Sequence, residues 1–81
     1  MTVVDARGQR CPVPVIRLAR AVKDDPEVRQ VVVLATDPAA AHDIPAWCRM
    51  RGHRLVERRE EGDHTAYVIE VVTPSAPATE Q

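Results

Sequence analysis

The sequence predicts a two-layer α/β sandwich with the order β-α-β-α-β-β, in which two helices cover one face of a single sheet. Two stretches, residues 12–23 and 38–51, have helical character, and residues 30–35 form a continuous β-branched run. Two further strand-like segments, residues 53–60 and 65–72, flank a turn. A chain of 81 residues has room for one small hydrophobic core, and two helices suffice to cover one face of such a sheet.

The first part of the chain is predicted to form a strand, a loop and a helix. Residues 2–5 are short and β-branched, and Gly8 makes the following loop flexible. Apolar residues then share one helical face, at positions Val15, Leu18, Ala19 and Val22. Prolines at positions 12 and 14 suit the first turn of this helix, and Pro26 ends it. Cys11 is therefore expected at the helix N-cap or next to it.

The second strand and helix follow from residues 30–51. The run Val31-Val32-Val33-Leu34 predicts a strand buried on both faces. Asp37 is expected to cap a helix that Pro38 begins. The sequence Asp43-Ile44-Pro45 is expected to interrupt this helix and to start a new one that runs to Arg51, with Gly52 as its C′ residue.

The last two strands are expected to form a hairpin, because Glu61-Gly62-Asp63 has turn chemistry. The predicted domain covers residues 1–73. Residues 74–81, which are small, polar or proline, are predicted to form a disordered tail.

Composition argues against several classes of protein. A net charge of −1, with one Trp, one Tyr and no Phe, argues against direct nucleic-acid binding. No apolar run is long enough for a signal peptide core or a transmembrane helix, so no membrane association is expected. Two cysteines without a Cys-x-x-Cys pair do not suggest a disulfide scaffold, and a cytoplasmic location is expected.

Cys11 is the candidate reactive residue. A cysteine at a helix start faces free backbone N–H groups and the positive end of the helix dipole, which both favour the thiolate. Arg10 adds a cation beside it, so the pKa of Cys11 is expected below the free value of about 8.5. Pro12 and Pro14 stiffen the turn and leave Val13 and Val15 as local N–H donors. The alternative is that Cys11 is an inert apolar residue at a helix start.

Two blocks of sequence resemble the TusA/SirA-like sulfur-carrier family. The first is Cys-Pro-Val-Pro at 11–14, preceded by Asp5, Gly8 and Arg10. The second combines Asp37-Pro38, Asp-Ile-Pro-Ala-Trp-Cys at 43–48 and Gly-His-Arg-Leu at 52–55. Their order and spacing extend the resemblance over residues 2–72.

The resemblance implies a four-stranded mixed sheet and a sulfurtransferase that carries sulfur as a persulfide on Cys11. A cysteine desulfurase or a rhodanese-like protein would supply the sulfur. The acceptors would serve tRNA thiolation, molybdenum-cofactor enzymes or other sulfur metabolism. No cofactor is expected. A regulatory or redox-sensing module on the same fold is the alternative, because an exposed thiol of low pKa oxidises readily.

Other residues have weaker functional signals. Cys48 is expected in the core with Ile44 and Trp47, although it could also act as a resolving thiol. The three histidines match no metal-binding spacing. A basic segment could form a docking surface for an acidic partner or a solvated helix face, and its docking candidates are Arg7, Arg17 and Arg20.

Overall fold

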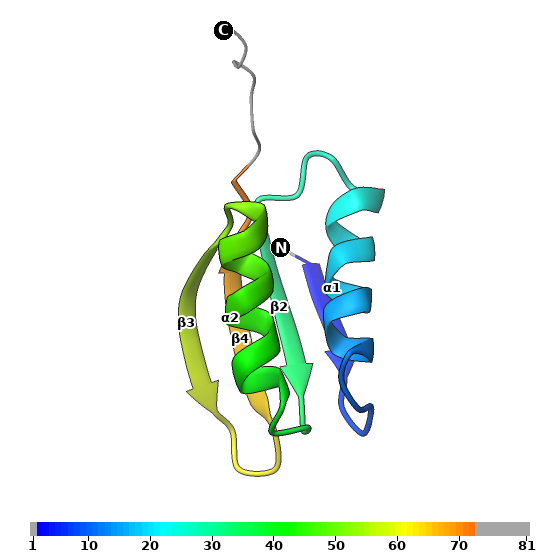
Figure 1. Cartoon of the computed structure of the whole chain (residues 1–81), viewed down its shortest axis with the longest axis vertical. Helices are drawn as coiled ribbons and strands as arrows, with labels where there is room; N and C mark the ends of the chain where they lie inside the picture. The colour runs from blue at the N-terminus through cyan, green and yellow to red at the C-terminus, as the bar shows by residue number, and fades with distance from the viewer. Residues whose placement is uncertain (1, 73–81) are drawn as a thin grey trace, which may run out of the picture.

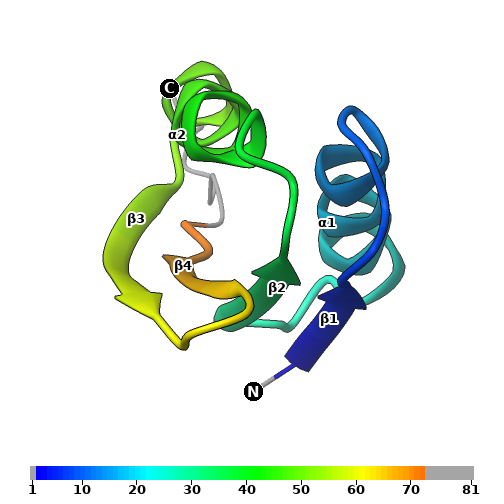
Figure 2. The ribbon, with the colours of Figure 1, turned by 90° about the horizontal axis from the view of Figure 1, so that it is seen from below.

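The computed structural model describes residues 2–72 as two helices packed on one face of a four-stranded sheet (Figures 1 and 2). The elements are β1 (Thr2–Ala6), α1 (Val13–Asp24), β2 (Gln30–Ala35), α2 (Ala40–Arg51), β3 (Arg54–Glu60) and β4 (Thr65–Glu70). This arrangement confirms the predicted α/β sandwich and its order of elements. The predicted tail at 74–81 lies outside the described residues.

The sheet is mixed and has the strand order β1-β2-β4-β3. Strands β1 and β2 are parallel, whereas β4 is antiparallel to both of its neighbours. The carboxyl ends of β1 and β2 therefore meet at one edge, where both helices also begin. The β3–β4 hairpin turns at this same lower edge in Figure 1. This edge holds the candidate site.

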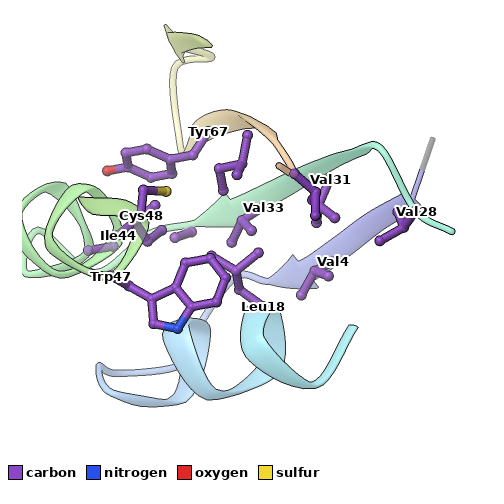
Figure 3. Close-up of a cluster of buried hydrophobic side chains, with 13 residues drawn as sticks. Val4, Leu18, Val28, Val31, Val33, Ile44, Trp47, Cys48 and Tyr67 are labelled. Atoms are coloured by element: carbon purple, nitrogen blue, oxygen red, sulfur yellow. The ribbon is translucent and has the colours of Figure 1, made fainter. Parts of the chain in front are cut away.

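The core lies between the helices and the sheet (Figure 3). Val31 and Val33 of β2 are fully buried there, and Leu18 of α1 packs into the same cluster. The predicted burial of β2 on both faces is wrong, because Val32 and Leu34 are only partly buried. Both helices cover the face of the sheet toward which Val31 and Val33 point. The alternate residues of β2 therefore point toward the face that neither helix covers.

Helix α2 runs without interruption through Pro45, so the predicted break at Asp43-Ile44-Pro45 is wrong. A proline inside a helix lacks the N–H that would bond four residues back. Burial compensates for this loss, because Ile44, Trp47 and Cys48 on the same helix are all buried. Tertiary packing thus outweighs the local signal of the proline.

The predicted end of α2 is confirmed. Gly52 adopts a left-handed conformation with φ of 80°, which glycine reaches without a steric penalty. The backbone N–H of His53 donates to the carbonyl of Cys48 (2.8 Å), so the chain reverses directly into β3. This connection places His53 beside the end of the helix.

Candidate functional site

Cys11 lies in the loop between β1 and α1, one residue before Pro12, the N-cap of the helix. Its side chain is partly buried. The backbone N–H of Cys11 donates to Asp37 Oδ2 (2.7 Å), across the sheet edge. Nearby, the N–H of Gly8 donates to Thr36 Oγ1 (2.8 Å). The loops that follow β1 and β2 are therefore tied together at the cysteine.

Asp37 holds two parts of the site at once. While Oδ2 accepts from Cys11, Oδ1 accepts from the backbone N–H of Ala39 (3.0 Å) in the turn before α2. Hydrogen bonds to the anion lower the pKa of Asp37, first from Ala39 and then from Cys11. The prediction that Asp37 caps a helix beginning at Pro38 is wrong, because α2 begins at Ala40 with Ala39 as its N-cap and no side-chain cap. The Asp37 carboxylate instead accepts a hydrogen bond within the turn before the helix. Its bond to Cys11 connects loops distant in sequence, so local patterns could not predict it.

Arginines hold the loop before Cys11. Arg17 of α1 donates from Nη1 to the carbonyl of Asp5 (2.6 Å) and to Gln9 Oε1 (3.1 Å). Arg7 pairs with the Asp5 carboxylate (2.7 Å), and this partner lowers the pKa of Asp5 to about 2. Two of the three candidate docking cations therefore also organise the loop. Arg20 lies further along α1, on the exposed surface.

The predicted low pKa of Cys11 is wrong for this structure. Burial raises the pKa of the thiol to about 11, assisted by a hydrogen bond and charge from Asp43 and by the charge of Asp37. The charge of Arg10 contributes instead to the lowered pKa of Asp37. Two carboxylates near the sulfur thus favour the protonated thiol, and both come from the second sequence block rather than from the residues adjacent to Cys11.

The other residues of the Cys-Pro-Val-Pro segment shape the start of α1. Pro14 is buried in the first turn, and Pro12 is exposed. The N–H of Val13 donates to the carbonyl of Arg10 (2.9 Å), so the prediction that Val13 offers a local donor is wrong. This bond closes the turn that contains Cys11. The segment therefore acts on the sulfur by fixing the backbone around it.

A shallow groove of about 200 Å³ lies between α1 and α2, next to the cysteine. Pro12 and Val15 line one side, and Asp43, Trp47 and Met50 line the other. Met50 is 76% exposed. The surface beside Cys11 is thus largely apolar and open.

Comparisons with known proteins agree with this geometry. The sequence model of the family described as "Sulfurtransferase TusA" matches residues 2–71. The chain belongs to the TusA sulfurtransferase family. Membership confirms the resemblance seen in the sequence and supports a sulfur-carrier role.

Individual TusA-family relatives match over most of their length. The sulfur carrier protein TusA of Pseudomonas aeruginosa is 42% identical over 67 residues, which cover 83% of this chain and 85% of that protein. A protein of Archaeoglobus fulgidus, provisionally named a sulfur carrier protein, is 44% identical over 70 residues, which cover 85% and 94%. The crystal structure of a SirA-like protein from Desulfitobacterium hafniense superposes with a TM-score of 0.76 at 26% identity, covering 86% of this chain and 96% of that one.

The second cysteine of this TusA-family chain is a core residue. Cys48 is 2% exposed and packs in the cluster with Ile44 and Trp47 (Figure 3). Burial raises the pKa of its thiol. The predicted core position of Cys48 is confirmed.

The three histidines lie in separate environments. His42 is exposed on α2, and His64 contacts Asp63 (2.7 Å) in the hairpin. His53 Nδ1 accepts from the N–H of Val72 (3.0 Å). Within residues 2–72 the structure contains no cluster of three His, Cys, Asp or Glu side chains that could hold a metal ion. No helix in this range is long and apolar enough to cross a membrane.

Proposed function

We propose that this TusA-family protein carries sulfur as a persulfide on Cys11. The observation that carries the proposal is the different exposure of its two thiols. Cys11 is partly exposed at the edge where both helices begin, whereas Cys48 is 2% exposed in the core. Sulfur exchange between two proteins requires direct approach of the donor to the acceptor sulfur. Cys11 meets this requirement in the folded chain.

The proposed chemistry consists of two displacements. In loading, the Cys11 thiolate attacks the terminal sulfur of a donor persulfide, a sulfur–sulfur bond forms, and the donor cysteine leaves as thiolate. In unloading, an acceptor thiolate attacks the terminal sulfur on Cys11, and Cys11 leaves as thiolate. Both steps conserve oxidation state, so they need no external oxidant, metal or organic cofactor. A cysteine desulfurase or rhodanese-like protein is the proposed donor, and the acceptor serves tRNA thiolation or another sulfur pathway.

The raised pKa of Cys11 favours a carrier over the redox-sensing alternative. A thiol with a pKa of about 11 is almost entirely protonated at neutral pH, and oxidants react with the thiolate. We therefore expect the free chain to oxidise slowly at Cys11. A partner that brings positive charge to Asp37 and Asp43 on docking would stabilise the thiolate, so that the nucleophile forms mainly within the complex.

We propose that this partner approaches over the start of α1. Arg7 and Arg17 supply positive charge at the loop, and Arg20 extends it along the helix. Ile16, which is 56% exposed, and Met50, which lines the shallow groove together with Pro12, add exposed apolar surface on the two helices. Charge of this kind mainly raises the rate of association, whereas buried apolar anchors supply affinity.

Loading tests the proposal. The purified chain is incubated with a cysteine desulfurase and cysteine, and the added sulfur is located by peptide mass mapping. We expect one sulfur on the Cys11 peptide, removable by reductant and absent in Cys11→Ser. Cys48→Ala is the matched control and should load normally. Added sulfur found only on the Cys48 peptide would refute the assignment.

A further inference from the structure

A second hollow, of about 300 Å³, lies between the later halves of α1 and α2. Arg20 and Lys23 line it from α1, and Arg51 lines it from the last turn of α2. Trp47 and His53 complete its polar and aromatic lining. In the part of the chain that the structure describes, no carboxylate lines the hollow. Among residues 2–72, its three cations also form no salt bridge.

His53 adds a neutral hydrogen-bond donor to this cluster. Its Nδ1 accepts from the N–H of Val72 (3.0 Å), so the ring proton of the neutral histidine is on Nε2. The His53 ring packs against the Trp47 ring with a centroid distance of 5.0 Å, which limits its orientation. The hollow is thus lined by three charged donors and one neutral donor whose tautomer is fixed.

The positive charges are not explained by the helix ends alone. Basic residues near a helix C-terminus complement the dipole, and both helices end on the same side of the molecule (Figure 1). Each dipole end amounts to about half a negative charge. Asp24 and Asp25 follow Lys23 at the end of α1 but do not line the hollow, so within the lining three cations face about one negative charge. Burial is the main cause that lowers the pKa of His53, and the charge of Arg51 adds to it. Arg49 is in the same last turn of α2 but does not line the hollow.

We propose that this hollow is a binding site for a phosphate-class oxyanion, either free or carried on a small metabolite. An anion with two negative charges would satisfy the unpaired guanidinium and ammonium groups through charge-assisted hydrogen bonds. It would also relieve the mutual repulsion of cations that converge from two helices. Cys11 is not part of this site, and Arg20 is the one residue that it shares with the proposed docking surface.

Titration of the full chain at low ionic strength tests the proposal. Trp47, the only tryptophan, provides a fluorescence signal and an indole N–H resonance in the hollow. Orthophosphate should give one saturable change, and sodium chloride or acetate at matched ionic strength should not. Ribose 5-phosphate is titrated as a second ligand. Tighter binding of ribose 5-phosphate would indicate an anion carried on a small metabolite, and tighter binding of orthophosphate would indicate the free anion. Cys11→Ser should bind as the parent does.

Variants distinguish a defined binding site from a general attraction of anions to the positive charge of the protein. Arg51→Gln and Lys23→Gln should each weaken phosphate binding by about tenfold, the loss expected for one charge-assisted hydrogen bond. Arg49→Gln is the matched control, because it removes an equal charge from the same helical turn. Binding that is unsaturable, equal for chloride and phosphate, or weakened equally by Arg49→Gln and Arg51→Gln would overturn the proposal.

Discussion

Cys11 is surrounded by groups with opposing effects on its acidity. From their places in the sequence, the start of α1 and Arg10 were expected to favour the thiolate, whereas in the structure burial, Asp43 and Asp37 raise the pKa of Cys11. The sequence indicated the first set, because those residues are neighbours of Cys11 in the chain. The second set could not be predicted, because the Asp43 and Asp37 carboxylates reach the sulfur only through the pairing of β1 with β2.

Neutralising Asp43 should make Cys11 more acidic. Asp43→Asn removes the charge that favours the bound proton, so the midpoint of pH-dependent alkylation should fall below the value of about 11. A lower midpoint means more thiolate at pH 8 and faster reaction with iodoacetamide. Asp24→Asn, at the other end of α1, is the control and should behave as the parent does. An unchanged or higher midpoint in Asp43→Asn would show that Asp43 does not act on the thiol.

Cys48 contributes packing rather than chemistry in this account. Cys48→Ala should lower the free energy of unfolding by about 1 kcal/mol, because it leaves a small cavity in a compact core. Urea denaturation measures this loss. The variant should still accept and release sulfur through Cys11. Normal folding together with failure to release sulfur would make Cys48 a resolving thiol.

At the scale of elements, local sequence signals predicted every helix and strand, but the predicted burial of β2 and the predicted break in α2 were wrong. The continuous apolar run of β2 suggested burial on both faces, yet Val32 and Leu34 face the side of the sheet that neither helix covers. Pro45 suggested a helix break, yet packing of Ile44 and Trp47 keeps α2 continuous. Both errors concern tertiary packing, which a propensity or a periodicity does not contain.

Asp37 supplies one of the two side-chain links between the βα loops, and Thr36 supplies the other through Gly8. Asp37→Ala removes the acceptors for the N–H groups of Cys11 and Ala39, so it should destabilise the fold by about 1–3 kcal/mol. It should also increase hydrogen exchange in the Cys11 loop. Asp37→Asn retains one acceptor oxygen and should fall between the parent and Asp37→Ala. Equal stability of all three proteins in urea would show that the loops are held by other contacts.

At the scale of the whole molecule, the proposed sulfur site occupies one edge of the sheet and the basic hollow lies further along the helices. The first position follows from topology, because parallel β1 and β2 bring their helix-starting loops together. The sequence indicated Cys11 through its Cys-Pro-Val-Pro segment, and the role of Cys11 in carrying sulfur stays a prediction. It did not indicate the hollow, because Arg20, Lys23 and Arg51 come from separate helices and converge only in the folded chain.

Charge on the exposed side of α1 should govern encounter with the sulfur donor. Arg20→Glu should slow loading by a desulfurase, most strongly at low salt, because rim charges act mainly on association rate. Alkylation of Cys11 by iodoacetamide should stay nearly unchanged. Arg29→Glu, before β2 and away from the site edge, is the control for net charge. Equal slowing by both variants would remove Arg20 from the docking surface.

The most direct test of the central claim follows one sulfur atom through the protein. The chain is loaded by a desulfurase, separated from the donor and mixed with an acceptor thiol protein, and both are analysed by intact mass and peptide mapping. We expect the mass of one sulfur atom to disappear from the Cys11 peptide as the same mass appears on the acceptor, with no transfer from Cys11→Ser. Sulfur that stays on the chain, or that reaches the acceptor equally well from Cys11→Ser, would contradict the account.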